Sequence, residues 1–320
     1  MNYKPIIIVA GEPNSIFLEI FFKSFKKKKF KSPIIIICSY KLFLLQMKKL
    51  NFNFKVNILG KDLSKLSLKK NRINLMNVNY KTEKAFEKIT SKSNKYIENC
   101  FILGIKLLKS GLSNKLINGP VSKKHFLKNK YFGITEYLAK KTKCKKFAML
   151  IYNKKLSVVP ITTHLPIKLV SRKINKQEII NKIELVNRFY KKNLNKKPNI
   201  AVTGLNPHCE SIHEYNEDIK LIKPSIKYLK KKQLKIEGPY PADTIFLKNN
   251  RKQFDIIVGM YHDQVLTPIK TIHEYNAINI TVGLPFIRVS PDHGPNEKML
   301  GKNKSNPLSL LNSIIFLDKF

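Results

Sequence analysis

Buried apolar runs alternate with amphipathic segments at the start of the chain. Residues 5–10 (PIIIVA) and 33–38 predict buried strands, and residues 16–25 between them predict a helix. A helix at residues 40–49 and a third strand at residues 54–58 follow. This β-α-β-α-β order predicts a parallel sheet with right-handed crossovers. The Gly-x-Gly-x-x-Gly loop of ordinary dinucleotide-binding domains does not follow the first strand.

The same alternation continues along the chain. Residues 61–80 are polar and predict irregular structure, whereas residues 147–152 and 156–161 predict a hairpin of two strands. A chain of 320 residues is long enough for two domains with real cores. Further strands are predicted from residue 116 and at residues 199–203, 256–258 and 278–282, and further helices at 83–110, 176–192, 218–232 and 307–317.

Composition indicates a globular protein of a reducing compartment. Hydrophobic residues make up 43% of the chain, which excludes a disordered polymer. No apolar run is long enough to span a membrane, and the apolar N-terminus lacks the small-residue cleavage site of a signal peptide. The four cysteines form no Cys-x-x-Cys pair. We therefore expect reduced thiols, a cytoplasmic location and no membrane partner.

The formal net charge of +40 comes mostly from lysine residues. Lysine, asparagine and isoleucine are all abundant while alanine and glycine are scarce, which is the skew that an A+T-rich genome imposes on exposed positions. No nucleic-acid recognition motif accompanies the charge, so we expect no specific nucleic-acid partner. Against this lysine background, an arginine indicates fixed bidentate binding of an anion. The arginines are Arg72, Arg172, Arg188, Arg251 and Arg288.

Polar groups gather where the last predicted strands end. His262 and Asp263 follow residues 256–258, Lys270 comes shortly afterwards, and the strand at residues 278–282 carries Asn279 and leads to Arg288. In open α/β sheets, ligands bind beyond the carboxyl ends of the strands. These residues would supply an imidazole and a carboxylate for a metal and two cations for an anionic substrate. The alternative is an ordinary hydrogen-bonded loop.

Three histidines occupy similar positions, each in a predicted loop after a buried strand: His164, His208 and His262. Three imidazoles leave at least one coordination position open, which is typical of a catalytic metal site. Three unrelated loop histidines are the alternative. A Gly-Pro break with a lysine at a helix start, NGPVSK at residues 118–123, fits either an anion site or an ordinary turn. Two prolines before Asp243 make the loop GPYPADT rigid and present this aspartate.

These blocks together resemble a known enzyme family. GEPNSI, NGPVSK, PITTHLPIK, GLNPHCE, GPYPADTIF, MYHDQVLTPIK and NITVGLPFIRVSPDHG are similar to the sequence blocks of 4-hydroxythreonine-4-phosphate dehydrogenase, and they occur in the family order. The resemblance covers about residues 5–315. It implies a two-domain isocitrate/isopropylmalate-dehydrogenase-like fold with α/β/α layers and a mostly parallel sheet. We expect one domain from residues 1–120 and 275–320 and a second from residues 121–274, with the active site in the cleft between them.

The resemblance also implies the chemistry. The family oxidises 4-phosphooxy-L-threonine with NAD or NADP to 2-amino-3-oxo-4-phosphooxybutanoate. This acid loses carbon dioxide to give 3-amino-2-oxopropyl phosphate in pyridoxal 5′-phosphate biosynthesis. The implied metal (zinc, magnesium or cobalt) is held by His164, His208 and His262. The implied assembly is a homodimer with its active site near the subunit interface. Implied substrate contacts come from Thr135, Lys270, Asn279 and Arg288.

Some roles stay open at this point. Either Asp243 or Asp263 could orient a histidine or accept the alcohol proton. The cofactor residues are unknown, and the segment from Asn279 to Asp292 is the expected place for them. The sequence does not name the native metal, the preferred nicotinamide cofactor or the subunit that supplies each ligand.

The chain also departs from the family pattern. Ile134 stands where the family has a histidine before Thr-Glu, so one substrate contact is lost or replaced. Asn14, Ser15 and Phe17 occupy a region where the family has further glycines. Two alternatives therefore accompany the main hypothesis. One is a related metal-dependent dehydrogenase of another phosphorylated hydroxy acid, and the other is a basic scaffold with weakened catalysis.

Overall fold

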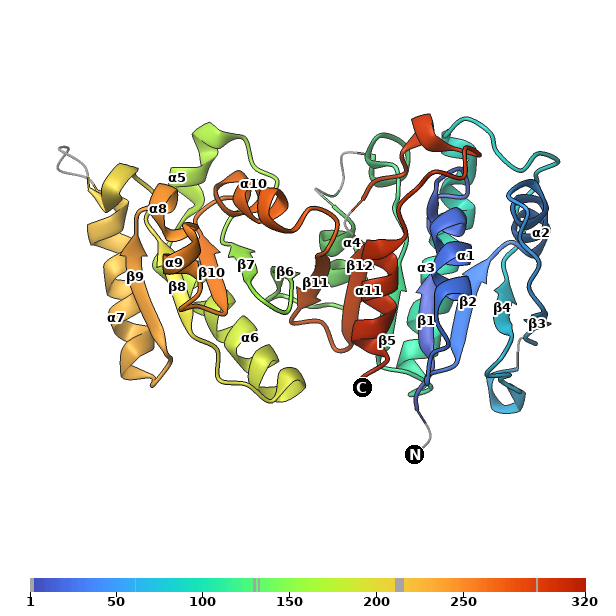
Figure 1. Ribbon diagram of the computed structural model, residues 1–320, viewed down its shortest axis with the longest axis horizontal. Helices are drawn as coiled ribbons and strands as arrows, with labels where there is room; N and C mark the ends of the chain where they lie inside the picture. Colours follow the sequence, from blue (N-terminus) through green and yellow to red (C-terminus); the bar gives the residue numbers. More distant parts are fainter. Residues whose placement is uncertain (1–2, 61, 129–130, 132, 211–215, 292) are drawn as a thin grey trace. The chain divides into compact units, whose positions relative to one another are not determined.

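The computed structural model describes residues 3–320 except 61, 129–130, 132, 211–215 and 292 (Figure 1). The chain divides into two compact units, which we treat separately. Unit 1 comprises Met1–Leu138 and Pro285–Phe320, and unit 2 comprises Ala139–Leu284. The boundaries expected from the sequence, near residues 120 and 274, fall earlier in the chain than these.

Unit 1 contains parallel strands in the order β3-β4-β2-β1-β5-β12. All residues of β1 and β2 are buried, as expected for strands covered by helices on both faces. The strands are β1 (Ile6–Val9), β2 (Ile34–Cys38), β3 (Val56–Ile58), β4 (Ile73–Asn77), β5 (Lys115–Asn118) and β12 (Ile287–Pro291). The main helices are α1 (Phe17–Lys27), α2 (Tyr40–Lys49), α3 (Asn94–Lys109) and α11 (Leu308–Leu317), and α4 (Ile134–Lys141) begins in this unit.

The C-terminal helix of unit 1 is fastened to the N-terminal part of the chain. The Asp318 carboxylate accepts hydrogen bonds from the backbone N–H groups of Lys31 and Ser32, at 3.0 and 2.7 Å. The Ser24 hydroxyl in α1 donates to the carbonyl of Pro307 at 3.4 Å. These bonds hold α11 against α1 and against the residues just before β2.

Unit 2 contains strands in the order β11-β6-β7-β10-β8-β9. Strands β7, β10, β8 and β9 are parallel, whereas β6 is antiparallel to β7 and β11. The β6–β7 pair confirms the predicted hairpin. The strands are β6 (Ala148–Tyr152), β7 (Ser157–Pro160), β8 (Ile200–Thr203), β9 (Ile236–Tyr240), β10 (Ile256–Gly259) and β11 (Ile278–Val282). The helices are α5 (Val170–Lys173), α6 (Lys176–Leu194), α7 (Lys223–Lys231), α8 (Ala242–Ile245), α9 (Lys248–Arg251) and α10 (His262–His273).

Some predicted elements differ from the structure. The helix expected from residue 83 begins at Asn94, and a separate turn at Ser91–Ser93 is capped by the Thr90 hydroxyl. Residues 61–80, expected to be irregular, contain β4. Strand β4 looks polar because Asn74 lies inside it. This side chain is fully buried, and its amide satisfies the carbonyl of Ile34 at 3.1 Å. Strands β9 and β12 were also not predicted.

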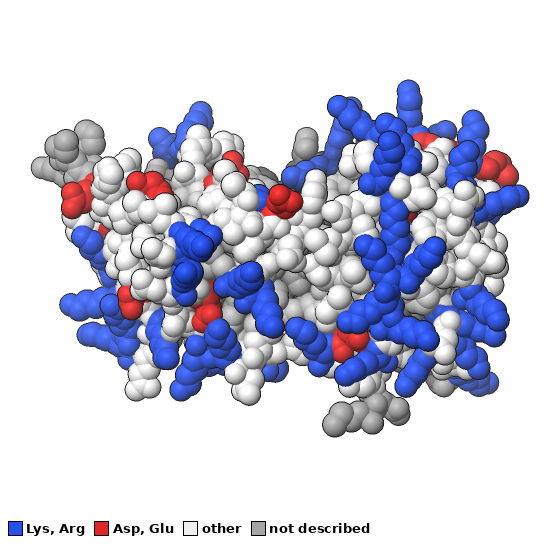
Figure 2. Space-filling model, viewed as in Figure 1, with Lys and Arg blue, Asp and Glu red and all other residues white. Residues whose placement is uncertain are grey.

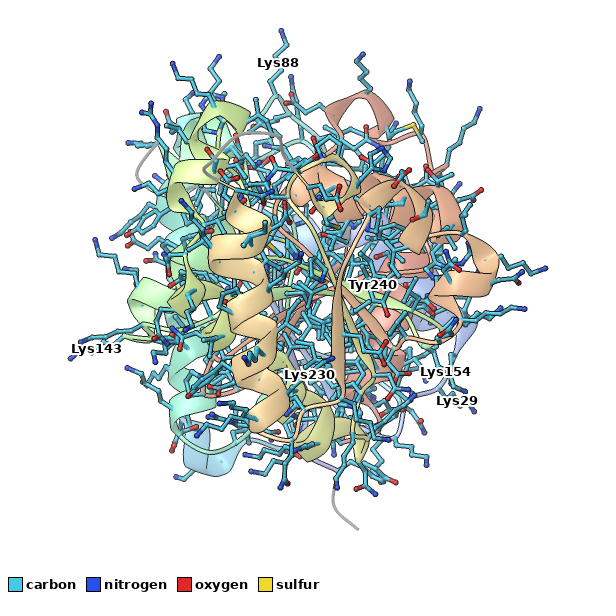
Figure 3. The ribbon with its side chains drawn as sticks, turned by 90° about the vertical axis from the view of Figure 1, so that its left-hand side faces the viewer. Lys29, Lys88, Lys143, Lys154, Lys230 and Tyr240 are labelled. Atoms are coloured by element: carbon cyan, nitrogen blue, oxygen red, sulfur yellow. The ribbon has the colours of Figure 1, made fainter. Side chains whose placement is uncertain are left out.

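Lys and Arg side chains are scattered over the visible face of both units, with wide areas of uncharged residues between them (Figure 2). Lys88, Lys143 and Lys154 point outward, as expected for solvated charges (Figure 3). Within the described part of the chain, no helix is both long and apolar enough to cross a membrane.

Candidate active site

Four neighbouring parallel strands of unit 2 end at one edge. In register, Val159 of β7 lies beside Val258 of β10, and Val258 lies beside Val202 of β8; β9 pairs with β8 on its far side. His164, His262 and His208 come shortly after β7, β10 and β8. The topology therefore brings the three loops that carry these histidines to the same edge of the sheet, where ligands bind in such folds.

Two of the three histidines lie close together. The ring centroids of His164 and His262 are 5.7 Å apart, with an angle of 40° between the ring planes. The loop expected around His262 is instead the N-terminus of α10, whose first residue is His262. His208 is exposed and has a left-handed backbone, with φ of 56°. In the described ranges, no three histidine, cysteine or acidic side chains are grouped closely enough to hold a metal ion.

Asp263 orients the imidazole of His262. The two side chains share a hydrogen bond of 2.6 Å between Nδ1 of His262 and Oδ1 of Asp263. We assign the proton to Nδ1, because a carboxylate accepts it there, and this leaves Nε2 as the lone-pair donor. A histidine oriented through its second nitrogen by a carboxylate is the usual arrangement of a metal ligand. Among the two aspartates left open by the sequence, Asp263 fits the orienting role.

The loop that carries His208 is shaped by a carboxylate that the sequence reasoning missed. Asp218 is fully buried and accepts hydrogen bonds from the backbone N–H groups of Leu205 and Asn206, at 2.8 and 3.1 Å. It also accepts from the side-chain amide of Asn206 at 2.9 Å. Asp218 lies in a predicted helix that has a polar first turn, so the sequence offered no signal for this contact.

Asp243 lies beyond the end of β9, in α8, and its side chain is exposed. Burial raises the pKa of the Cys209 thiol, while a hydrogen bond with the Gly204 backbone lowers it and the Asp218 and Asp243 carboxylates make smaller contributions that raise it. The position of Asp243 suits a group that exchanges protons at the same edge of the sheet.

Lys270 and Asn279 are the remaining predicted site residues of unit 2. Lys270 lies in the last turn of α10, where a cation is favourable, and it is half-buried. Asn279 lies in β11 and is half-buried; its backbone pairs with Ile151. The side-chain oxygen of Asn279 is buried, and among the described residues it has no hydrogen-bond partner. A buried polar atom of this kind is suited to a ligand that completes its hydrogen bonding.

Arg288 and Thr135 are joined in unit 1. Nε of Arg288 donates to the side-chain oxygen of Asn118 at 2.6 Å, and Nη1 donates to the Thr135 hydroxyl at 3.2 Å. The arginine is fully buried. Burial lowers the pKa of Arg288 to about 10, and the Glu136 carboxylate opposes this shift. The guanidinium is therefore charged at neutral pH, and its orientation is fixed by Asn118, the first residue of the NGPVSK segment.

The loop after β1 also ends at the carboxyl edge of unit 1. Glu12 is buried, and its carboxylate accepts hydrogen bonds from the Asn14 N–H at 3.2 Å and the Ser93 hydroxyl at 3.1 Å. Burial raises the pKa of Glu12 to about 7 despite these bonds. The Ser15 hydroxyl donates to the Glu12 carbonyl at 2.7 Å. The residues that replace the family's glycines thus build their own hydrogen-bonded turn. Asp292, at the end of the segment expected to bind the cofactor, lies outside the described residues.

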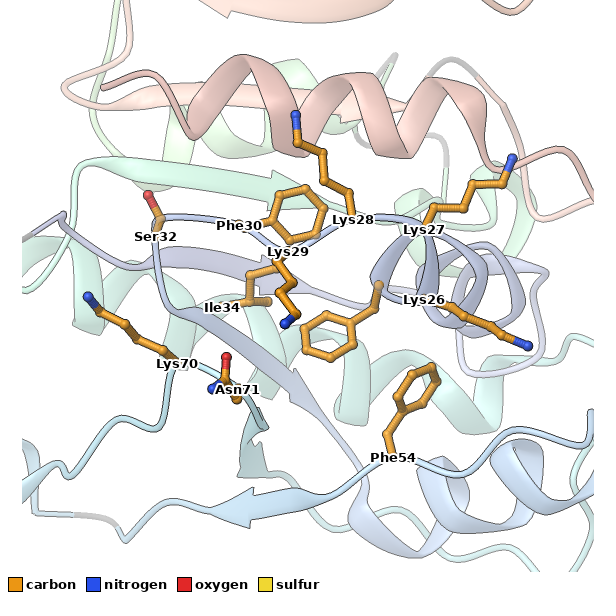
Figure 4. Close-up of a pocket in the computed structure, with 11 residues that line it drawn as sticks. Lys26, Lys27, Lys28, Lys29, Phe30, Ser32, Ile34, Phe54, Lys70 and Asn71 are labelled. Carbon is orange, nitrogen blue, oxygen red and sulfur yellow. The ribbon is translucent and has the colours of Figure 1, made fainter.

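A lysine-lined cavity of about 660 Å³ is found elsewhere in unit 1. Ser32 and Ile34 place it at the amino end of β2, the edge opposite to Asn118. Lys27 and Lys28 point away from Phe54 and Asn71 (Figure 4). Flexible lysines at this edge are poorly arranged for catalysis, so we do not regard the cavity as the active site.

Comparison with known proteins identifies the family. The sequence profile of the "Pyridoxal phosphate biosynthetic protein PdxA" family matches residues 29–316. The chain belongs to the PdxA family. A Sulfurihydrogenibium relative named 4-hydroxythreonine-4-phosphate dehydrogenase is 36% identical over 318 residues, which cover 97% of this chain and 96% of the relative. A Pectobacterium atrosepticum relative named D-threonate 4-phosphate dehydrogenase is 35% identical over 218 residues, or 67% of each chain.

Solved structures of PdxA-like proteins confirm the predicted fold class. The crystal structure of 4-hydroxythreonine-4-phosphate dehydrogenase from Klebsiella pneumoniae has a TM-score of 0.85 and 27% identity, covering 98% of this chain and 97% of that one. A β-decarboxylating dehydrogenase from Thermococcus kodakarensis, with a TM-score of 0.52 and 11% identity, covers 98% of this chain and 81% of that one and shares the fold alone. The chain thus has the isocitrate-dehydrogenase-like fold with a mostly parallel sheet.

Proposed function

We propose that this PdxA-family protein is an NAD- or NADP-dependent and divalent-metal-dependent dehydrogenase of 4-phosphooxy-L-threonine. The observation that carries the proposal is the pair of imidazoles, His164 and His262, at the carboxyl edge of parallel strands, with Asp263 bonded to His262. The family match and the similarity to named 4-hydroxythreonine-4-phosphate dehydrogenases support it.

The two neighbouring imidazoles of His164 and His262 suit a divalent metal, although among the described residues no third histidine, cysteine or acidic side chain is grouped with them. Neutral imidazoles bind zinc and cobalt well, and magnesium less readily. We propose that His164, His208 and His262 would hold the ion. When bound, it would supply Lewis acidity toward the substrate hydroxyl and the carbonyl formed from it. Asp263 would keep His262 in the tautomer that presents Nε2.

The reaction assigns further roles to the chain. Oxidation moves a hydride from the carbinol carbon of the substrate to the nicotinamide ring and a proton from the hydroxyl to a base. We propose Asp243 as that base, because it is exposed in α8, just beyond the carboxyl end of β9, at this edge of the sheet. The 3-oxo acid then loses carbon dioxide, and the electron pair of the broken C–C bond passes to the ketone oxygen to form an enolate. Protonation of the enolate carbon gives 3-amino-2-oxopropyl phosphate.

Binding of the phosphate is assigned to cations and a hydroxyl. In unit 1, Arg288 and Thr135 supply a charge and hydrogen bonds that suit a phosphate dianion, and in unit 2 Lys270 supplies a further cation for the substrate. Asn279 supplies a buried carbonyl oxygen that accepts a hydrogen bond from the substrate. We further propose a homodimer in the cytoplasm, as the family resemblance and the four free cysteines suggest.

The test is production of NADH or NADPH from 4-phosphooxy-L-threonine by the purified chain. The protein is first treated with a chelator and then supplied with zinc, cobalt or magnesium. We expect turnover that requires a metal and one nicotinamide cofactor. Absence of turnover with every metal and both cofactors would show that this proposal is wrong.

A second candidate function is oxidation of D-threonate 4-phosphate. A relative of that name is 35% identical over 218 residues, or 67% of this chain, whereas the 36% identity of the first candidate extends over 318 residues. Ile134 replaces a family histidine that is expected to contact the substrate. The loss of this contact would allow the chain to prefer a different substrate from other family members. Measurement of kcat/KM for both compounds under the same conditions decides between the two functions.

A further inference from the structure

The first residue of the NGPVSK segment, Asn118, is bonded to the buried arginine of unit 1. Asn118 is the last residue of β5 and is itself buried. Its Oδ1 accepts a hydrogen bond from Nε of Arg288 at 2.6 Å, and its Nδ2 donates to the carbonyl of Gly119 at 2.9 Å. A carboxylate at this position would meet the Gly119 carbonyl with repulsion, because it has no hydrogen to donate. The contacts therefore require an acceptor that is part of a neutral amide.

The backbone around Asn118 is fixed by its neighbours. Strand β5 pairs with β1 on one side and with β12, the strand of Arg288, on the other. The N–H of Gly119 donates to the carbonyl of Val9 at 2.8 Å. A Cβ on Gly119 would lie 2.1 Å from the carbonyl oxygen of Ala10, so glycine is needed for this close approach. Asn118 thus meets the arginine from a backbone that is held by two strands.

The contact at Nε decides how Arg288 can hold an anion. A guanidinium binds an oxyanion either side-on, through Nε and one Nη atom, or end-on, through its two Nη atoms. Asn118 occupies the Nε–H, which closes the side-on mode. The hydroxyl of Thr135, another proposed substrate residue, accepts from Nη1 at 3.2 Å. The end-on mode therefore brings the anion to the Nη atoms, one of which is bonded to Thr135.

From these contacts we infer that Asn118 is a positioning residue for phosphate binding: its neutral bond at Nε turns the guanidinium of Arg288 so that the phosphate is bound end-on through the Nη atoms. The inference rests on the proposed function, in which Arg288 binds the phosphate of the substrate. Asn118 does not touch the ligand in this scheme. Because its amide adds no charge, it orients the arginine without weakening the attraction to a phosphate dianion. The NGPVSK segment thus serves an anion site without binding the anion itself.

The test measures the Kd of inorganic phosphate and the KM for 4-phosphooxy-L-threonine with the full-length protein. Asn118→Leu removes the acceptor at Nε, whereas Asn118→Asp keeps an acceptor there and adds a negative charge beside the arginine. The control is Asn74→Leu, which removes another buried amide of unit 1, in β4. We expect Kd and KM to rise about tenfold or more in both Asn118 variants and to stay unchanged in the control. The value of kcat should change much less, because the phosphate lies away from the reacting carbon.

A second readout follows the Nε–H of Arg288 directly. The chain has only five arginines, so their Nε–H signals can be separated by NMR, and Arg288→Lys identifies the signal of Arg288. In the wild-type protein this hydrogen should exchange slowly with water. Its signal should move little when phosphate is added, because Asn118 and not the anion holds it. The slow exchange should be lost in Asn118→Leu and kept in Asn118→Asp.

The possible results separate the inference from the proposed function. Thermal melting shows which variants are folded. A wild-type phosphate Kd in folded Asn118→Leu, or in Asn118→Asp if only that variant folds, would overturn the inference alone. A large shift of the Arg288 Nε–H signal on phosphate binding would do the same. A phosphate Kd that does not change in Arg288→Lys would overturn the phosphate site together with the inference. Phosphate binding that depends on Asn118 and Arg288 in a protein without turnover would support the inference and overturn only the proposed reaction.

Discussion

The Arg288 guanidinium donates a hydrogen bond to the Thr135 hydroxyl at 3.2 Å, although the two residues are 153 positions apart in sequence. Arg288 lies in β12 and Thr135 in α4, and both side chains are buried. Asn118 holds the other side of the guanidinium, at Nε. The arginine is therefore oriented before any ligand arrives, which reduces the entropic cost of binding an anion.

Arg288→Lys should lower kcat/KM for 4-phosphooxy-L-threonine by about 10- to 150-fold. An ammonium lacks the planar fork, and a hydrogen bond to a charged group is worth roughly 1.5–3 kcal/mol. Steady-state kinetics measure the effect, with thermal melting as a check on folding. Arg188→Lys, at an exposed position of α6, is the matched control and should leave kcat/KM unchanged. Equal kinetics for the two variants would contradict a role for Arg288 in binding.

His262→Ala and His208→Ala should each abolish turnover and reduce the bound metal. Each removes one of three proposed ligands, and a two-ligand site retains little affinity. Metal content is measured by elemental analysis after dialysis against trace metal. His125→Ala, which removes a half-buried imidazole of unit 1, is the control and should retain the wild-type metal content. Unchanged metal content in both site variants would eliminate the proposed triad.

Ile134→His should raise kcat/KM for 4-phosphooxy-L-threonine by about one to two powers of ten. The substitution restores a hydrogen-bonding side chain at the first residue of α4, next to Thr135, and such a bond to a charged group is worth roughly 1.5–3 kcal/mol. Ile134→Phe adds a ring without hydrogen-bonding groups, so it should bring no gain. A folded Ile134→His protein without improvement would instead favour a different natural substrate, and D-threonate 4-phosphate is the first to test.

Glu12→Gln should change how stability depends on pH. Burial raises the pKa of Glu12 from 4.5 to about 7 in the folded protein. Because the folded pKa is the higher one, the stabilising contribution of the protonated carboxyl is present below pH 4.5 and is lost as the pH rises through 7. The loss amounts to about 3 kcal/mol, since one pKa unit corresponds to about 1.4 kcal/mol.

Thermal melting between about pH 5 and pH 8 measures this effect. The neutral glutamine should raise Tm relative to wild type at the high end of the range and much less at the low end. Glu83→Gln, whose parent carboxylate has 86% of its side chain exposed, should show no such trend. A Tm difference between Glu12→Gln and wild type that does not vary with pH would refute the buried titration.

Gly204→Ala should destabilise the protein and disturb the His208 loop. An added Cβ would lie 2.6 Å from Oδ1 of Asp218 and 2.7 Å from Sγ of Cys209. Overpacking of this kind costs about 1–3 kcal/mol, which corresponds to a decrease in Tm of roughly 2–12 °C. Gly60→Ala, where no atom lies within 4 Å of the added Cβ, should melt within about a degree of wild type. Similar Tm values for the two variants would contradict the close approach at Gly204.

The strands that could be predicted from the sequence are those made of apolar residues that are buried in the structure. The aliphatic runs of β1, β2, β8 and β10 are buried on both faces, so their pattern alone identifies them. Strand β4 was missed because Asn74 satisfies its amide through Ile34, a contact 40 residues away that no local pattern reveals. The helix before residue 110 was extended too far because Thr82 and Thr90 form local turns that resemble a polar helix start.

Only those site residues that have a local sequence signal could be predicted. A histidine after a buried strand can be recognised locally, and His164 and His262 do lie together. The supporting residues cannot be found in this way. Arg288 contacts Asn118 across 170 positions, and this contact exists because β12 pairs with β5 in the sheet. Strand order is decided by the packing of the whole sheet, so residues whose role depends on it become visible only in the structure.

The central position of β10 has a consequence for biosynthesis. Strands β7 and β8 leave the ribosome first, yet each pairs with β10, which is made later. Until Ile256–Gly259 has emerged, the nascent chain exposes two unpaired strand edges, and such edges promote aggregation. Translation that stops shortly before this strand therefore yields a product that cannot close its sheet. The segment is a sensitive point for chaperone dependence and for the design of truncated forms.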